Sequence, residues 1–185
     1  MNKEGTLASR LGVTTHVSPL RIKLRRVMET YPVADASTLE DWLLDLANAR
    51  GVTVVSRSLD KLGPPGTPFP GPDEVSNAEL AVAICQAQSL DRPQWLRAAA
   101  QLIARGDIPL PELLLMARRE RVERILAELA RQSLKVDPDH AAWKAIDAAF
   151  GDLPPLRDSL VHWTRLAQPV MAPGKPNAAR WELVR

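Results

Sequence analysis

The stretch PELLLMARRERVERILAELARQSL, residues 111–134, decides what kind of fold this chain can adopt. Its apolar residues recur every three or four positions, a spacing that places them on one face of an α-helix. On one uninterrupted helix, Arg118 would lie in the apolar stripe between Leu114 and Val122. A lone guanidinium is costly to bury among aliphatic side chains. We therefore expect the helix to break near residues 118–121, and a buried acidic partner for Arg118 is the alternative.

Four arginines crowd residues 118–124, which raises the question of nucleic-acid binding. A surface that binds phosphates would leave its arginines unpaired, whereas here acidic residues are interleaved with them. We therefore interpret the run as the solvated side of the helical segment. The expected ion pairs at helical spacing are Arg119–Glu123, Glu120–Arg124 and Arg124–Glu128.

The composition is that of a globular protein. The 185 residues are 45% hydrophobic and 25% charged, enough for a core without disulfides or metals. The net charge of +2 is too small to attract nucleic acid by itself. Cys85 is the one cysteine, so neither an intrachain disulfide nor a thiolate zinc site is expected. There is no apolar run long enough for a membrane span and no secretory signal, which favours the cytoplasm and no membrane contact.

The most obvious boundary is GPPGTPFPGPD, residues 63–73, with five prolines and three glycines. Proline lacks an amide donor and fixes φ, so neither a helix nor a central strand is expected to pass through. The predicted organisation is a small basic N-terminal unit at residues 1–62, a connector at 63–73, a helical bundle at 74–167 and a proline-rich tail at 168–185. One last turn is expected in the tail, at residues 177–183.

Helix signals follow the connector. Ser76 and Glu79 fit a capping box, in which the serine caps the helix and the glutamate reaches back to its amide. A second capping box is predicted for Ser37 and Glu40. Prolines near helix starts and short connections predict a mainly α fold, a compact multi-helix bundle of antiparallel helical hairpins.

The N-terminal unit leaves an alternative open. Residues 19–27 alternate apolar and basic side chains, which is a strand pattern, but Ser18 and Pro19 also form a good helix start. We favour the helix. Residues 52–57, VTVVSR, are predicted to form a short strand, so the unit has one or two strands according to which alternative holds.

Two sets of residues are candidate contacts with partners. The N-terminal segment, residues 6–27, resembles a helix-turn-helix in outline, although Pro19 lies where a recognition helix should be continuous. Its basic side chains are candidate contacts with nucleic acid or an acidic partner: Arg21, Lys23, Arg25 and Arg26. Apolar residues in the tail and connector are candidate contacts with a partner protein: Trp181, Leu183, Val184 and Phe69.

No catalytic or metal-binding residues are predicted. His16, His140 and His162 are widely separated, and no phosphate-binding or nucleophile motif is present. No cofactor and no small-molecule substrate are therefore expected. The sequence favours a non-enzymatic protein–protein interaction module from a bacterial cytoplasm, of the antitoxin, adaptor or accessory-subunit type, that binds another protein or itself. The alternatives are a DNA-binding transcriptional regulator and, third, an enzyme of unrecognised type.

Overall fold

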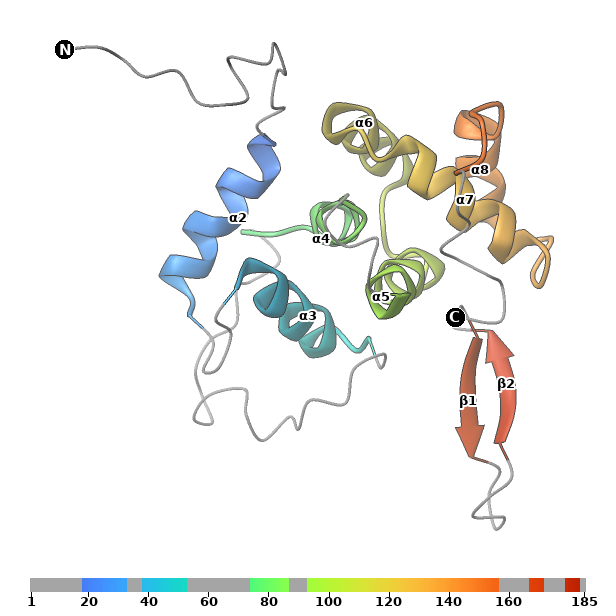
Figure 1. The fold of residues 1–185 in the computed structure, drawn as a ribbon, viewed down its shortest axis with the longest axis horizontal. Helices are drawn as coiled ribbons and strands as arrows, with labels where there is room; N and C mark the ends of the chain where they lie inside the picture. Colours follow the sequence, from blue (N-terminus) through green and yellow to red (C-terminus); the bar gives the residue numbers. More distant parts are fainter. Residues whose placement is uncertain are drawn as a thin grey trace.

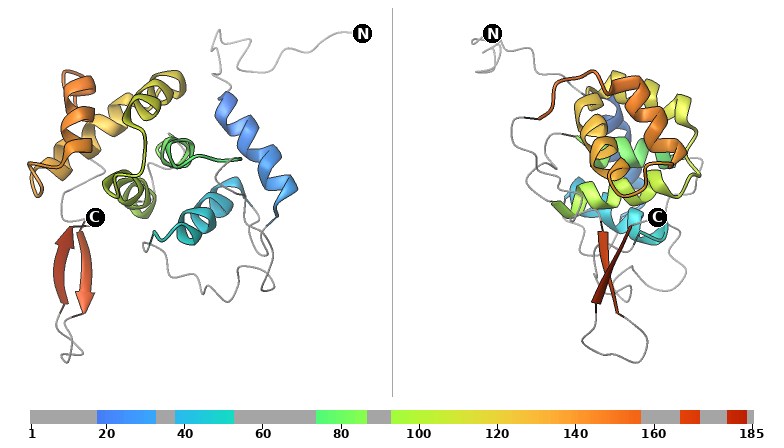
Figure 2. Two further views of the ribbon diagram at one scale, coloured as in Figure 1. Left: turned by 180° about the vertical axis from the view of Figure 1, so that it is seen from behind. Right: turned by 90° about the vertical axis from the view of Figure 1, so that its right-hand side faces the viewer.

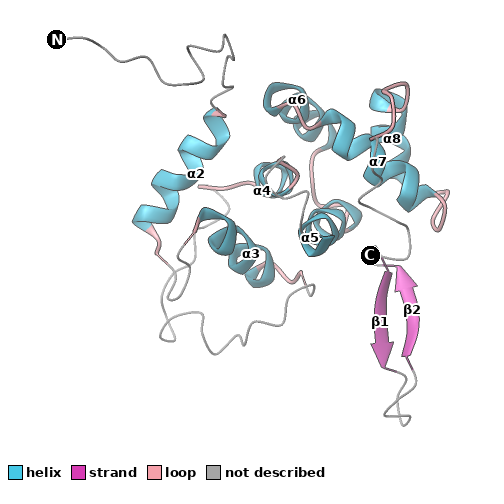
Figure 3. Ribbon diagram, viewed as in Figure 1, coloured by secondary structure: helices cyan, strands magenta, loops and turns pink. Residues whose placement is uncertain are grey.

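The computed structural model describes residues 18–32, 38–52, 74–86, 93–156, 167–171 and 179–183. These residues are mainly helical, as Figure 3 shows, and the predicted helical bundle is confirmed. The division into an N-terminal unit and a bundle stays a prediction, because residues 63–73 lie outside the described part. The described elements are α2 (Pro19–Thr30), α3 (Leu39–Ala49), α4 (Asn77–Ile84), α5 (Pro93–Ala104), α6 (Leu110–Glu120), α7 (Glu123–Leu134), α8 (Ala141–Phe150), β1 (Ala167–Met171) and β2 (Ala179–Leu183).

Helix α4 lies at the centre of the bundle. It contacts α2, α3, α5 and α6, which surround it in Figure 1. Its sequence, NAELAVAI, is apolar on nearly every side, and all of its residues except Asn77 and Glu79 are buried. A helix that is apolar all round has to be enclosed by other elements. The hydrophobic core extends from α4 in both directions, from Leu20 on α2 to Phe150 on α8.

The predicted break in the long helical segment is confirmed. Helix α6 ends at Glu120 and α7 begins at Glu123. Between them Arg121 has φ 59° and ψ 42°, a left-handed conformation. The Val122 amide then donates to the Ala117 carbonyl at 3.0 Å, which satisfies a backbone acceptor at the end of α6.

The break keeps Arg118 out of the core. Its side chain is exposed, and the guanidinium lies over the ring of Phe150, 5.3 Å from the ring centroid. A cation over an aromatic face is a favourable contact that leaves the charge hydrated. The structure thus avoids the buried guanidinium that a continuous helix would have required.

Two of the predicted ion pairs are wrong for the same reason. Arg119–Glu123 and Glu120–Arg124 would need one continuous helix, but α6 and α7 are separate and run in different directions (Figure 1). Glu120 is buried instead of facing solvent. The third pair, Arg124–Glu128, lies within α7 and stays a prediction.

Replacement of Arg121 by glycine is expected to raise the free energy of unfolding by about 0.5–1 kcal/mol, because glycine adopts positive φ without a Cβ clash. Urea unfolding followed by circular dichroism measures the change. Arg121→Ala is the control, since it removes the same side chain but keeps the Cβ. Equal stability of the two variants would show that backbone strain at this position is not the cause.

The helical alternative for residues 19–27 is confirmed, and the strand alternative is wrong. Ser18 caps α2 by accepting a hydrogen bond from the Arg21 amide at 3.0 Å, and the helix buries Leu20 and Leu24. Pro19 occupies the first turn, where its missing amide has no acceptor to lose. The strand predicted at residues 52–57 lies outside the described residues beyond Val52.

The capping box predicted for Ser37 and Glu40 is wrong by one residue. Thr38 is the N-cap of α3, and its hydroxyl accepts from the Asp41 amide at 3.1 Å. Glu40 is consequently free of a capping role, and its carboxylate bonds to Arg21 on α2.

The tail forms a β-hairpin, so the single turn predicted at residues 177–183 is wrong. Strands β1 and β2 pair antiparallel, with Pro169 opposite Trp181. In a two-stranded sheet each strand has an unpaired edge, where proline is tolerated. Figures 1 and 2 show the hairpin extending away from the helices.

Candidate functional site

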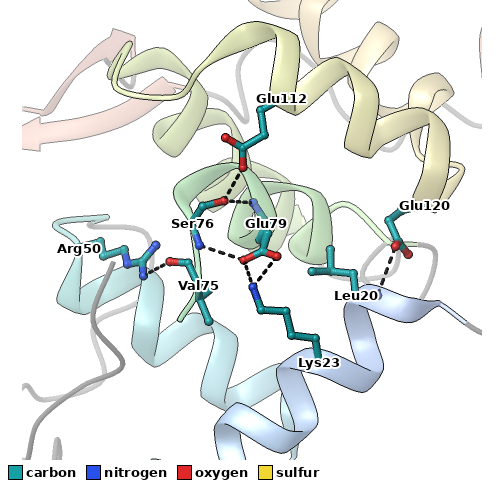
Figure 4. Close-up of polar contacts among 8 residues, drawn as sticks. All are labelled: Leu20, Lys23, Arg50, Val75, Ser76, Glu79, Glu112 and Glu120. Carbon is teal, nitrogen blue, oxygen red and sulfur yellow. Dashed lines mark hydrogen bonds and ion pairs between the residues drawn. The ribbon is translucent and has the colours of Figure 1, made fainter. Parts of the chain in front are cut away.

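Two of the four basic side chains predicted to contact a partner are bound within the chain. The Arg21 guanidinium forms an ion pair with Glu40 and a 3.4 Å hydrogen bond with Gln86. The Lys23 ammonium lies 2.7 Å from both carboxylate oxygens of Glu79 (Figure 4). These contacts join α2 to α3 and α4, so Arg21 and Lys23 hold α2 in place.

The capping box at the start of α4 is confirmed, and it takes part in the same network. The Glu79 amide donates to the Ser76 hydroxyl at 3.1 Å, and the Ser76 amide donates to the Glu79 carboxylate at 3.0 Å. The Ser76 hydroxyl in turn donates to Glu112 of α6 at 2.9 Å (Figure 4). One helix start therefore binds both α2, through Lys23, and α6.

Glu120, the last residue of α6, is the most buried acid of this network. Its side chain is 1% exposed and accepts hydrogen bonds from the Ser18 hydroxyl at 2.5 Å, the Leu20 amide at 3.2 Å and Gln86 at 3.1 Å. A carboxylate at a helix N-terminus satisfies free amides and complements the helix dipole. Glu120 thereby fixes the start of α2 on the end of α6.

The outward side of α2 has a different character. Ile22, Arg25, Arg26 and Glu29 are exposed at positions i, i+3, i+4 and i+7, which share one side of a helix. We call these four residues the α2 face. Ile22 is 43% exposed. Neither arginine side chain makes a hydrogen bond or an ion pair with any described residue.

Helix α6 repeats this arrangement. Leu115, Arg118 and Arg119 are exposed at positions i, i+3 and i+4, and we call them the α6 face. Leu115 is 69% exposed, and the Arg119 side chain is 64% exposed. Arg119 Nε lies 3.9 Å from Glu120 Oε1, the same oxygen that binds the Leu20 amide. The α6 face therefore ends next to the start of α2.

An open cleft of about 430 Å³ lies beside the start of α4. Its polar groups are already bonded to one another: Arg50 donates to Asn77 at 2.7 Å, and Asn77 donates to Asp107 at 3.0 Å. Burial lowers the pKa of Arg50, and the charges of Asp107 and Glu79 counteract this effect. The residues that line the cleft are Arg50, Val75, Ser76, Asn77, Asp107, Pro109 and Glu112.

Cys85 and His140 lie in surroundings that suit a role in packing the bundle. Burial raises the pKa of the Cys85 thiol to about 12, so it stays protonated near neutral pH, as expected for a buried cysteine. His140 Nε2 lies 3.1 Å from the carbonyl of Ala104, the last residue of α5. Among the described residues no three His, Cys, Asp or Glu side chains gather as metal ligands would.

No described helix is both long enough and apolar enough to span a bilayer.

The predicted contacts in the tail and connector are placed only in part. Trp181 and Leu183 lie on β2, opposite Pro169 and Ala167. Val184 and Phe69 lie outside the described residues. These four contacts stay predictions.

The ion pair of Arg21 with Glu40 is expected to give the stability a defined pH dependence. Burial by itself would raise the pKa of the Glu40 carboxyl, but the hydrogen bond from Arg21, a backbone hydrogen bond and the charges of Arg21 and Arg25 outweigh it and lower the pKa below its usual 4.5. A carboxyl whose pKa is lowered on folding stabilises the fold above its unfolded pKa, and this contribution is lost as the pH falls through the folded pKa.

Glu40→Gln should therefore be less stable than the parent chain near neutral pH and equally stable once the pH lies below the lowered pKa. Chemical unfolding at a series of pH values measures the difference between the two chains. A difference that stays constant down to the lowest pH would contradict the assignment.

No family model, curated protein or solved structure matches this chain.

Proposed function

We propose that this chain is a non-enzymatic protein–protein interaction module, a helical bundle of antiparallel hairpins that binds another protein through the α2 face. The observation that carries the proposal is an exposed aliphatic side chain, Ile22, on the same side of α2 as Arg25 and Arg26, whose side chains make no hydrogen bond or ion pair with the described residues. Other contacts hold this helix firmly in the bundle. Arginine next to exposed apolar area is typical of interface residues.

The rigidity of α2 supports this role. Arg21, Lys23 and Glu120 fix the helix to three different helices. A surface whose backbone is already ordered loses less entropy on binding. The α2 face can therefore act as a preorganised docking surface.

Duplex DNA is the alternative ligand. Of the basic residues at 21–26, Arg21 and Lys23 are neutralised by acids, and Glu29 on the α2 face would repel phosphates. The exposed Ile22 also has little to contact on a phosphate backbone. These features favour a protein surface.

The test compares the full chain with the variant Ile22→Ser/Arg25→Ser/Arg26→Ser. Proteins retained by the immobilised chain are identified, purified and titrated calorimetrically, and the variant should weaken binding at least about ten-fold, or 1.4 kcal/mol. Lys135→Ser/Val136→Ser/Lys144→Ser is a matched control, since it removes two exposed cations and Val136, which is 40% exposed.

Equal affinity of the chain and the α2 variant for the retained protein would overturn the proposal. Tight binding to duplex DNA, with an affinity that falls steeply as salt rises and is lost in the α2 variant, would favour the DNA-binding alternative.

A further inference from the structure

The β-hairpin of the tail has one face made only of apolar residues. In an antiparallel pair, residues opposite each other lie on the same face, and the faces alternate along each strand. The register of β1 and β2 therefore assigns the two charged residues, Arg180 and Glu182, to one face together with Val170 and Gln168. Six apolar residues share the other face: Ala167, Pro169, Met171, Ala179, Trp181 and Leu183.

The described helices give this hairpin little support. Strands β1 and β2 pair with each other, and no described helix packs closely against either of them. Figures 1 and 2 show both strands extending away from the bundle. A two-stranded hairpin on its own is at best marginally stable in water, and further strands stabilise it. The hairpin is therefore suited to receive another strand.

The two outer edges of the hairpin differ in what they offer to such a strand. Proline has no amide, so Pro169 and Trp181 cannot exchange two backbone hydrogen bonds as a hydrogen-bonded pair does. In the alternative type of pair, both residues direct their backbone N–H and C=O groups to the outer edges. The outer edge of β1 then lacks a donor at Pro169, whereas the outer edge of β2 offers both groups of Trp181. Strand addition is favoured at β2.

The sequence of β2, ARWEL, is complementary to itself in charge. When two such strands pair antiparallel about Trp181, Arg180 lies opposite Glu182 of the partner subunit, and Glu182 lies opposite the partner subunit's Arg180. Opposite charges directly across two strands stabilise the pairing. Within the hairpin the same two residues lie opposite Val170 and Gln168, which are uncharged. A second copy of β2 therefore supplies the charges that β1 does not.

We infer that the outer edge of β2 is a self-association surface, to which a second copy of this chain adds its own β2. The product is a four-stranded antiparallel sheet with a two-fold axis at the Trp181 pair, and such a contact closes as a dimer. The two β2 strands exchange about six backbone hydrogen bonds, and the axis brings both apolar faces to the same side of the sheet. This surface goes beyond the proposed function and does not use the α2 face.

The experiment measures the mass of the full chain by sedimentation velocity over about a hundred-fold range of concentration, in about 50 mM salt. Two single variants, Arg180→Glu and Glu182→Arg, each place like charges opposite one another at both symmetric positions. The double exchange Arg180→Glu/Glu182→Arg restores opposite charges. Lys135→Glu is the matched control, because it reverses one exposed charge at the end of α7.

The parent chain is expected to form a dimer, and either single variant should raise the dissociation constant at least about ten-fold. The double exchange and the Lys135→Glu control should leave the dissociation constant unchanged. An equimolar mixture of the two single variants is expected to form a heterodimer, because each variant supplies the charge that the other lacks. This recovery also shows that the single variants still form the hairpin.

A chain that stays monomeric over the whole range would overturn the inference. A dimer that neither single variant weakens would show that the copies associate through another surface. Recovery in neither the double exchange nor the mixture would contradict the antiparallel register about Trp181. The α2 variant should dimerise like the parent chain, so failure of this inference leaves the proposed function to its own partner test.

Discussion

Replacement of Trp42 by alanine should lower the free energy of unfolding by about 4 kcal/mol, because it empties a large volume in the core. Trp42 is 0% exposed and lies on α3 in the hydrophobic core. Its indole Nε1 also donates to the Tyr31 carbonyl at 2.9 Å, a bond that ties the end of α2 to α3. Urea unfolding followed by circular dichroism measures the loss.

Two further substitutions separate the effect of the lost volume at Trp42 from that of the lost hydrogen bond and from that of an exposed residue. Trp42→Phe keeps most of the volume but removes the hydrogen bond, so a loss of about 1–2 kcal/mol is expected. Leu115→Ala removes a leucine side chain that is 69% exposed, and its effect should stay within about 0.5 kcal/mol. A similar small loss in Trp42→Ala would show that α3 is not packed as described.

Replacement of Glu120 by alanine is expected to lower the free energy of unfolding by about 3 kcal/mol. The Leu20 amide would lose its acceptor while it stays buried, and a buried polar group without a partner costs about 1–3 kcal/mol. The Gln86 side-chain amide would keep the Ser18 hydroxyl at 2.8 Å but lose its second acceptor. The Ser18 hydroxyl would also lose a 2.5 Å bond to the carboxylate. Thermal and urea unfolding measure the effect.

Glu120→Gln should cost about half as much, since its amide oxygen can still accept one or two of these bonds. Glu29→Ala is the control, because it removes an exposed carboxylate from α2 without loss of a buried contact. Equal stability of Glu120→Ala and Glu29→Ala would contradict the buried network at the α2–α6 junction.

Local signals in the sequence predicted much of the fold. The capping box of Ser76 and Glu79 and the helix break near residues 118–121 depend on residues within a few positions of each other, where helical geometry and burial energies give a definite answer. The start of α2 at Ser18 and Pro19 is a further local signal. The hairpin of β1 and β2 was missed, since the proline content of the tail argues against strands.

The contacts of the candidate site depend on distant residues and could not be predicted in the same way. Arg21 and Lys23 were predicted to contact a partner, but their acids, Glu40 and Glu79, lie 19 and 56 residues away. Glu120 gave no local signal of a buried role, since an acid among arginines is ordinarily solvated. Its donors are brought to it only when the bundle is assembled.

The hydrogen bond between Glu120 and the Leu20 amide joins residues 100 positions apart, so Leu20 is synthesised well before its acceptor. At a translation rate of about 5–20 residues per second, the segment of α2 leaves the ribosome about 5–20 seconds before its acidic anchor is made. Glu40 and Glu79, which bind Arg21 and Lys23, are made within that interval, but the Leu20 amide still lacks the acceptor that α6 supplies. A chaperone or an early-bound partner would meet this segment first, before the carboxylate arrives to secure it.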